Sequence, residues 1–168
     1  MRDAHLHPAF APRGVLLLVL AMLPPLAASV LGQLFTAVGL VGWYRTLHKP
    51  FFTPPDVVFP LVWTFLYALM AVSFWRILRA KPEAGPKGMA IGVFLGQLGL
   101  NVAWSWAFFG QRSPLLGLVV IGLLLLAIAL NIRAFAKIDR AAGWALYPYL
   151  VWVGFATLLN AAIVFLNR

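Results

Sequence analysis

Few side chains in this sequence can exchange protons or bind metals, and none falls inside a long apolar stretch. General acid–base catalysis and intramembrane proton relays need such groups at the reacting depth. Cysteine is absent, so thiolate chemistry and Cys-ligated metals are excluded. We therefore expect no conventional catalytic residue and no metal site. The four acids and three histidines are Asp3, Asp56, Glu83, Asp139, His5, His7 and His48.

One apolar stretch instead carries three polar side chains at helical spacing. Gln97, Asn101 and Ser105 are four residues apart, so on a helix they form a single stripe. An amide that faced lipid would lack hydrogen-bond partners, so the stripe should face the interior of a bundle. Two interpretations stay open. The stripe either links helices, at about 1 kcal/mol per hydrogen bond, or forms the polar wall of a ligand cavity.

Aromatic residues occupy two further stretches, where a flat ligand could stack. Trp63 and Tyr67 lie one turn apart, and Trp152 lies one turn before Ala156 and two turns before Leu159. Stacked and edge-to-face arrangements are favoured between aromatic rings. Tryptophan and tyrosine also gather at membrane surfaces as a belt, which fits Trp63 and Trp152 less well because both lie several residues into their stretches. The belt interpretation covers Trp43, Tyr44, Trp144, Tyr147 and Tyr149.

Composition places these residues in a membrane. Of 168 residues, 63% are hydrophobic and only 10% are charged, whereas a soluble domain carries about 25% charged residues. Five stretches reach the roughly 20 residues that span a bilayer. We therefore predict an all-α integral membrane protein, a five-transmembrane-helix bundle over residues 14–168 that follows an N-terminal tail of residues 1–13. The predicted helices are 14–40, 57–78, 89–109, 115–133 and 143–166.

Three of these stretches have individual features. Pro24-Pro25 predicts a kink or break in the first. That stretch could alternatively be a cleaved signal peptide, since Ala27-Ala28-Ser29 are small, although its apolar run continues to Val41. The fourth stretch is almost uniformly Leu, Val and Ile and is typical of a lipid-facing helix. Only a few residues separate the third and fourth stretches, which predicts a tight antiparallel hairpin.

The basic residues predict an orientation. The net charge is +9, which on a membrane protein indicates positive loops on the inner side and not nucleic-acid binding. The amino-terminal side collects nine Lys and Arg residues and the other side four. This favours a cytoplasmic amino terminus and an outer carboxyl terminus, as expected for a multi-pass protein of a bacterial inner membrane, with an outer membrane as the alternative. The four on the outer side are Arg45, Lys49, Arg112 and Arg168.

The loop of residues 41–56 is rich in proline and aromatic residues. Thr53, Pro54 and Asp56 resemble a capping box at the start of the second helix. We interpret the loop as a lid over the mouth of the bundle, and a rigid connector in the headgroup layer is the alternative. The lid residues that we single out are Arg45, Lys49, Pro50, Pro54 and Pro55.

Three blocks of this sequence resemble the TspO/translocator-protein family, also called tryptophan-rich sensory or peripheral benzodiazepine receptor proteins. They are WYRTLHKPFFTPPDVVFPLVWTFLY, QLGLNVAWSWAFFG and PYLVWVGFATLLNAAIVFLN. The resemblance covers residues 42–167 and implies a five-helix bundle, usually a homodimer. It also implies a cavity for porphyrins such as protoporphyrin IX, haem or other tetrapyrroles, with no cofactor required. The implied wall is Trp43, Tyr44, Trp63, Tyr67, Gln97, Asn101, Trp104, Ser105, Trp152, Ala156 and Leu159.

The resemblance leaves several functions open. A receptor or sensor that influences porphyrin metabolism is the first. A light- and oxygen-dependent porphyrin-degrading enzyme is the second, and it would use the pair Trp63 and Trp152. A tetrapyrrole or sterol transporter and a ligand-free membrane scaffold are further alternatives. The family's sterol motif needs a Tyr followed by a basic residue near the end of the last helix, and the segment from Leu159 to Phe165 has no Tyr. This argues against sterol binding through that motif.

Overall fold

The computed structural model describes residues 12–81 and 84–168. Most of the predicted N-terminal tail, with His5 and His7, lies outside the described residues, as does Glu83. Within them the chain forms helices and no strand. The elements are α1 (Pro12–Leu40), α2 (Trp43–Thr46), α3 (Val58–Arg79), α4 (Ala84–Ser105), the π-helix η1 (Trp106–Gly110), α5 (Pro114–Ala136), α6 (Arg140–Trp144) and α7 (Tyr147–Leu166).

Five segments of the described chain are long and apolar enough to cross a membrane. The prediction of an all-α, five-helix membrane protein is therefore confirmed. The third and fifth segments each combine two elements, because α4 continues into η1 and the short α6 precedes α7. The five segments are Gly14–Leu40, Val58–Arg79, Pro86–Gly110, Pro114–Ala136 and Arg140–Leu166.

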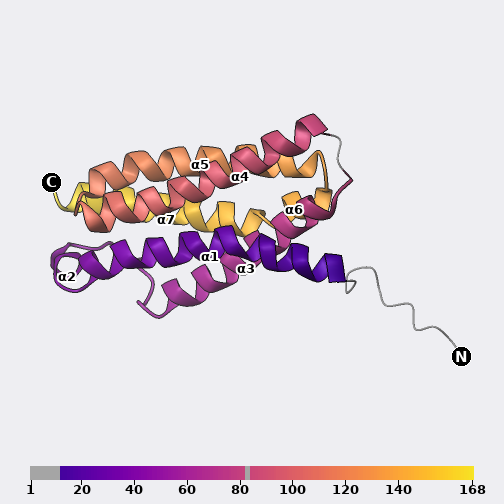
Figure 1. The fold of residues 1–168 in the computed structure, drawn as a ribbon. Coiled ribbons are helices and arrows are strands. Elements are labelled where there is room, and N and C mark those ends of the chain that lie inside the picture. The colour runs from indigo at the N-terminus through magenta and orange to yellow at the C-terminus, as the bar shows by residue number, and fades with distance from the viewer. Residues whose placement is uncertain (1–11, 82–83) are drawn as a thin grey trace, which may run out of the picture.

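The long helices lie side by side in a bundle (Figure 1). Helix α1 packs against both α3 and α4, and α5 packs against both α4 and α7. The order of neighbours is therefore α3, α1, α4, α5 and α7. Helix α2 and the carboxyl terminus lie at one end of the bundle (Figure 1). The start of α1, the end of α3 and helix α6 lie at the other end. The loop of residues 41–56 and the end of α7 therefore share one end of the bundle, where His48 contacts Asn167.

Of the kink or break predicted at Pro24-Pro25, the break does not occur, since α1 is continuous through both prolines. Each proline removes one backbone donor, a loss that packing against neighbouring helices makes tolerable in membrane proteins. The side chains of Ala21 and Ala28 flank the prolines and are fully or almost fully buried. At Gly39 a Cβ would lie 2.6 Å from the carbonyl oxygen of Phe109, so α1 contacts η1 through its backbone. Helix α1 is thus an integral part of the bundle packing.

Helix α5 presents exposed apolar side chains, as expected of a lipid-facing helix, but one of its faces is buried. Seven of its residues are buried, including the amide Asn131, because α5 packs between α4 and α7. The most apolar part of α1 is only 22% buried, compared with 33% for α5. Lipid tails are as apolar as leucine, so a uniformly apolar run does not reveal whether a helix faces lipid or protein.

The third span ends in the π-helix η1, which leads into the predicted tight hairpin. The amide of Gln111 donates to the carbonyl of Trp106 over 2.8 Å, the five-residue spacing of a π turn. Phe108 and Phe109 of this turn are buried in the bundle. Ser113 then caps α5 by accepting from the amide of Leu116 over 3.2 Å. The third and fourth spans therefore reverse direction within a few residues, as predicted.

An ion pair joins α3 to α6 at the opposite end of the bundle. Arg76 Nη2 lies 2.9 Å from Asp139 Oδ2. Asp139 also caps α6 by accepting from the amide of Ala142 over 3.0 Å. Burial alone would raise the pKa of Asp139, but hydrogen bonds from Arg76 and Ala142, together with the Arg76 charge, outweigh it and lower this pKa. The charged form of Asp139 is therefore the form that stabilises the fold.

Substitution of Asp139 should reveal this stabilisation. Asp139→Ala removes both the helix cap and the ion pair, and we expect the free energy of unfolding to fall by about 1–2 kcal/mol. Most of this loss should come from the cap, because Arg76 is partly exposed and its ion pair is therefore screened by solvent. Asp139→Asn keeps an effective cap and should therefore lose less stability than Asp139→Ala. The folded pKa is lowered, so the charge contributes fully above the unfolded pKa of about 3.9 and is lost as pH falls below it. Thermal unfolding in detergent at pH 7 and pH 3 should show the gap between wild type and Asp139→Asn closing in acid. A gap that is independent of pH would contradict this account.

Candidate functional site

A chain of three polar side chains crosses the interior between α3, α4 and α7. The hydroxyl of Tyr67 donates to Asn101 Oδ1 over 2.7 Å. Asn101 Nδ2 in turn donates to the hydroxyl of Tyr149 over 3.1 Å. Asn101 and Tyr149 are almost completely buried. The central residue of the predicted polar stripe therefore ties three spanning helices together inside the bundle.

The other two residues of the stripe are also buried but face different neighbours. Gln97 Nε2 contacts Met70 Sδ of α3 at 3.9 Å, and its Oε1 is buried without a hydrogen-bond partner among the described residues. Ser105 lies against α1, since a Cβ at Gly32 would be 3.3 Å from its Oγ. The stripe thus faces the bundle interior as predicted, but its three members do not form one continuous polar wall.

Trp63 extends the aromatic part of this interior. Its ring lies 5.6 Å from that of Tyr67, in a tilted arrangement, and 6.2 Å from that of Tyr149, edge to face. These separations fall in the range of favourable aromatic contacts. Trp63, Tyr67, Asn101 and Tyr149 therefore form one aromatic and amide cluster, which we call the interior cluster.

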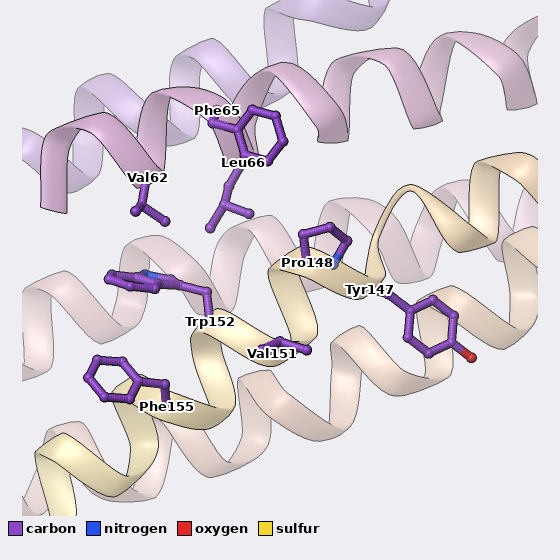
Figure 2. A pocket seen from close by; sticks show the side chains of 8 residues that line it. All are labelled: Val62, Phe65, Leu66, Tyr147, Pro148, Val151, Trp152 and Phe155. Atoms are coloured by element: carbon purple, nitrogen blue, oxygen red, sulfur yellow. The ribbon is translucent and has the colours of Figure 1, made fainter. Parts of the chain in front are cut away.

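A groove with a volume of about 690 Å³ runs between α3 and α7 (Figure 2). Figure 2 shows the Trp152 indole lying across the space between the helices, near Val62, while the Tyr147 hydroxyl points away from it. Phe65 and Val151 are exposed on the outer surface, so the groove opens toward the membrane. Ligand pockets measure roughly 300–1,000 Å³ and are mostly apolar, as this one is. Its lining residues are Val62, Phe65, Leu66, Tyr147, Pro148, Val151, Trp152 and Phe155.

Trp63 and Trp152 contact different partners. Trp152 packs edge to face on Phe59 at 5.9 Å and tilted on Phe155 at 5.5 Å. Ala156, one turn further along α7, is half-buried against the same core as both indoles. The two tryptophans thus lie on opposing helices, one in the groove and one beside the hydrogen-bonded chain.

A second aromatic cluster lies at the loop end of the bundle. Phe108 of η1 stacks on Trp104 at 5.6 Å and contacts Trp43 edge to face at the same distance. Trp104 Nε1 also donates to Asn160 Oδ1 over 3.3 Å. This cluster, which we call the loop-end cluster, contains four predicted site residues, one of which, Trp104, also packs against the core that holds the interior cluster. They are Trp43, Tyr44, Trp104 and Leu159.

Tyr44 is buried in the loop-end cluster and does not belong to an exposed belt. Its ring lies 5.5 Å from that of Phe109, and Lys49 Nζ lies 4.1 Å above it as a cation–π contact. Burial raises the pKa of the Tyr44 hydroxyl, and the negative charge of Asp56 raises it further. Arg45, by contrast, is exposed. One of the two basic lid residues is therefore held against the protein.

The predicted capping box at the start of the second helix is wrong. The Thr53 hydroxyl donates to the carbonyl of Pro50 over 2.7 Å, and α3 begins only at Val58 without a side-chain cap. The physical reason is that a residue before proline avoids the helical region, and Pro54, which would be the first helical residue, precedes Pro55. Pro54 and Pro55 thus continue the loop as irregular chain.

The loop is attached to α7 at two points. Phe52 contacts Phe155 at the rim of the groove, with ring centres 6.3 Å apart. Asn167, just after α7, accepts from the backbone amide of His48 and donates to its carbonyl, each over 2.9 Å. The same Asn167 amide donates to the carbonyl of Ile163 over 2.8 Å. The side chain of Asn167 therefore fastens the middle of the loop to the end of the last helix.

Sequence reasoning misses two residues of these sites, Tyr149 and Asn167. The belt interpretation includes Tyr149, yet Tyr149 is 1% exposed and its hydroxyl is hydrogen-bonded to Asn101. Its spacing of eleven residues from Asn160 puts both on one face of α7, a signal that could have identified them. Asn167 had no comparable signal, because its partner is backbone in a distant loop. Trp144 and Tyr147 are exposed, which fits the belt interpretation.

The arrangement suits binding more than proton transfer. No cluster of three or more His, Asp or Glu side chains occurs in the part of the chain that the structure describes. The buried polar groups among the spans are neutral amides and hydroxyls, and Asn101, Tyr149 and Asn160 are held by hydrogen bonds from or to other helices. Such groups can orient a ligand through directed hydrogen bonds, with indole and phenol rings supplying the contact area.

The attachment of the loop by Asn167 can be tested by hydrogen–deuterium exchange. Asn167→Ala removes both bonds to His48, so we expect the amide of His48 to exchange at least several-fold faster. Asn167→Asp is the matched control, since it keeps an acceptor for that amide and should preserve much of the protection. Unchanged exchange at His48 in the alanine variant would show that other contacts hold the loop.

Comparison with known proteins agrees with these observations. The TspO/MBR family matches residues 21–166. The tryptophan-rich protein TspO of Chlorobaculum tepidum is 42% identical over 142 residues, which cover 84% of this chain and 90% of the relative. The tryptophan-rich sensory protein of Cereibacter sphaeroides is 37% identical and covers 74% and 77%. The human translocator protein is 33% identical and covers 84% of each chain. This five-helix membrane protein therefore belongs to the TspO/MBR family.

Proposed function

We propose that this chain is a membrane receptor or sensor whose intramembrane aromatic site binds a porphyrin such as protoporphyrin IX. The observation that carries the proposal is the apolar groove between α3 and α7, next to the interior cluster. A porphyrin is a large flat aromatic ring with two acidic groups at one edge. Its binding requires broad aromatic contact, a small number of directed hydrogen bonds, and cations near the edge that carries the acidic groups.

Each of these needs has a counterpart in the chain. Trp152 lies across the groove (Figure 2), and Trp63 presents a second indole from the opposing helix. The hydrogen-bonded chain of Tyr67, Asn101 and Tyr149 lies beside Trp63, and we assign the directed hydrogen bonds to it. Lys49 and Arg45 lie in the loop whose Phe52 touches the rim of the groove. We assign them to the acidic groups of the porphyrin, which charge-assisted bonds would hold.

We assign a packing role to four further predicted residues, which hold the helices around the proposed site. Gln97 and Ser105 connect α4 to its neighbours, and Trp104 and Leu159 fill the loop-end cluster. The name of the Cereibacter sphaeroides relative, a tryptophan-rich sensory protein, favours a sensory role. We therefore propose that the bound ring is detected and that the chain influences porphyrin metabolism through it.

Porphyrin binding by tryptophan variants tests the proposal. We expect Trp63→Leu and Trp152→Leu each to weaken protoporphyrin IX binding by up to about tenfold, since an aromatic contact contributes roughly 0.5–1.5 kcal/mol beyond its buried area. Titration in detergent, followed by the absorbance of the porphyrin, measures the affinity without relying on tryptophan emission.

Trp106→Leu is the matched control, because Trp106 is 41% exposed on η1 and belongs neither to the groove nor to the two clusters. Its affinity should equal that of the wild type. Equal affinity in all four proteins, or non-saturating uptake of porphyrin, would mean that the ring only partitions into the detergent and would refute the proposed site.

We also propose that the protein forms a homodimer through α4. Gly88, Gly92, Gly96 and Gly99 follow one another at helical spacing, and a Cβ at any of them would meet no atom within 4 Å. In membranes, small residues let two helices approach closely and gain packing contacts. This open glycine stripe is therefore the face on which a second copy could pack backbone to backbone.

Leucine substitutions on α4 test the dimer. Gly92→Leu and Gly96→Leu should shift the purified protein toward monomer in light-scattering measurements in detergent. Gly122→Leu on α5 is the control, since its added side chain also enters open space. A dimer that persists in both α4 variants, or dissociates equally in the control, would exclude this face.

A further inference from the structure

A basic pocket lies at the end of the bundle opposite the loop, far from the groove between α3 and α7. It has a volume of about 280 Å³ and is lined by Arg76, Arg79 and Ala80 of the α3 end and by Asp139 before α6. A water molecule occupies roughly 30 Å³ in the liquid, so a tetrahedral oxyanion fits in this space. The pocket belongs to neither aromatic cluster.

The two guanidinium groups of the pocket keep hydrogen-bond donors that contacts within the described chain do not satisfy. Arg76 bonds Asp139 through Nη2 alone, and its Nε is buried without an acceptor among the described residues. Arg79 stacks on the ring of Trp75 at 4.6 Å, a contact that holds the group without neutralising it. Two positive charges therefore face one carboxylate, and guanidinium donors remain for a further acceptor.

Among the described residues, neighbouring charges do not offset this excess. Asp139 already accepts from Arg76 and from the amide of Ala142, so its charge is committed to the ion pair and the helix cap. Lys87 Nζ donates to the carbonyls of Leu78 and Ala80, over 2.9 and 2.8 Å, and thereby covers the negative end of α3. The pocket is thus complementary to an anion.

The position of the pocket identifies the source of the anion. Arg76 and Arg79 lie in the last turn of a membrane-spanning helix, and the ends of such helices reach the level of the lipid headgroups. Arginine forks match phosphate oxygens, and basic pockets between spanning helices suit anionic headgroups. We propose that this pocket binds the phosphate of an anionic phospholipid headgroup. The uneven distribution of basic residues favours a cytoplasmic location for this end, which is the side rich in anionic lipid.

Binding of defined lipids to the purified protein tests this assignment. Native mass spectrometry of the full chain in detergent, titrated with phosphatidylglycerol or phosphatidylcholine, counts the bound lipids. We expect one phosphatidylglycerol to bind in clear preference to phosphatidylcholine. Arg79→Gln should weaken that binding roughly tenfold, as the loss of a charge-assisted hydrogen bond predicts. Arg79→Lys, which keeps the charge but not the fork, should be intermediate.

The control variant is Arg133→Gln, which removes an exposed charge at the same end but does not line the pocket. Its lipid binding should match the wild type. Equal binding by wild type and Arg79→Gln, or an equal loss in Arg133→Gln, would mean diffuse attraction to a basic surface and would overturn the proposal. Displacement of the lipid by millimolar inorganic phosphate would overturn the lipid assignment in favour of a free anion. Porphyrin affinity should be unchanged in Arg79→Gln, which separates this site from the groove.

Discussion

The bundle depends on the rule that polar groups inside a membrane must find partners within the protein, because lipid offers none. The amide of Asn101 meets this requirement by bonding tyrosines from two other helices. Asn160 does the same between α7, Trp104 and the carbonyl of Pro114. Since apolar side chains gain little from leaving lipid for protein, these directed bonds and close packing decide which helices become neighbours.

The same requirement shapes the proposed binding site. Each amide near the groove is held by neighbouring groups, so it stays fixed in orientation and can present a donor or acceptor in one direction. The aromatic rings around it supply contact area without charge. At Gln97 the requirement is not fully met, since Oε1 has no described partner. A buried acceptor of this kind is costly, and it lies on the stripe that carries the central amide of the site.

The two ends of the bundle are closed by different means. At the loop end, Asn167 bonds the backbone of His48 and aromatic rings fill the space below. At the other end, Asp139 combines an ion pair with a helix cap, and Lys87 covers the last carbonyls of α3. Charge is therefore kept at the surface level of the membrane, where water and headgroups can solvate what the protein leaves unpaired.

The sequence alone determined the five spans and the inward face of Gln97, Asn101 and Ser105, because hydropathy and helical spacing are local properties. It also indicated the family through three local blocks. Only the tertiary structure decided that Tyr149 is buried, that Ser105 faces α1 and that Trp63 and Trp152 contact different partners. It also showed that α1 continues through Pro24-Pro25 and that Thr53 bonds Pro50 instead of capping a helix. These features depend on which helices lie beside one another, and apolar runs of similar composition carry no information about their neighbours.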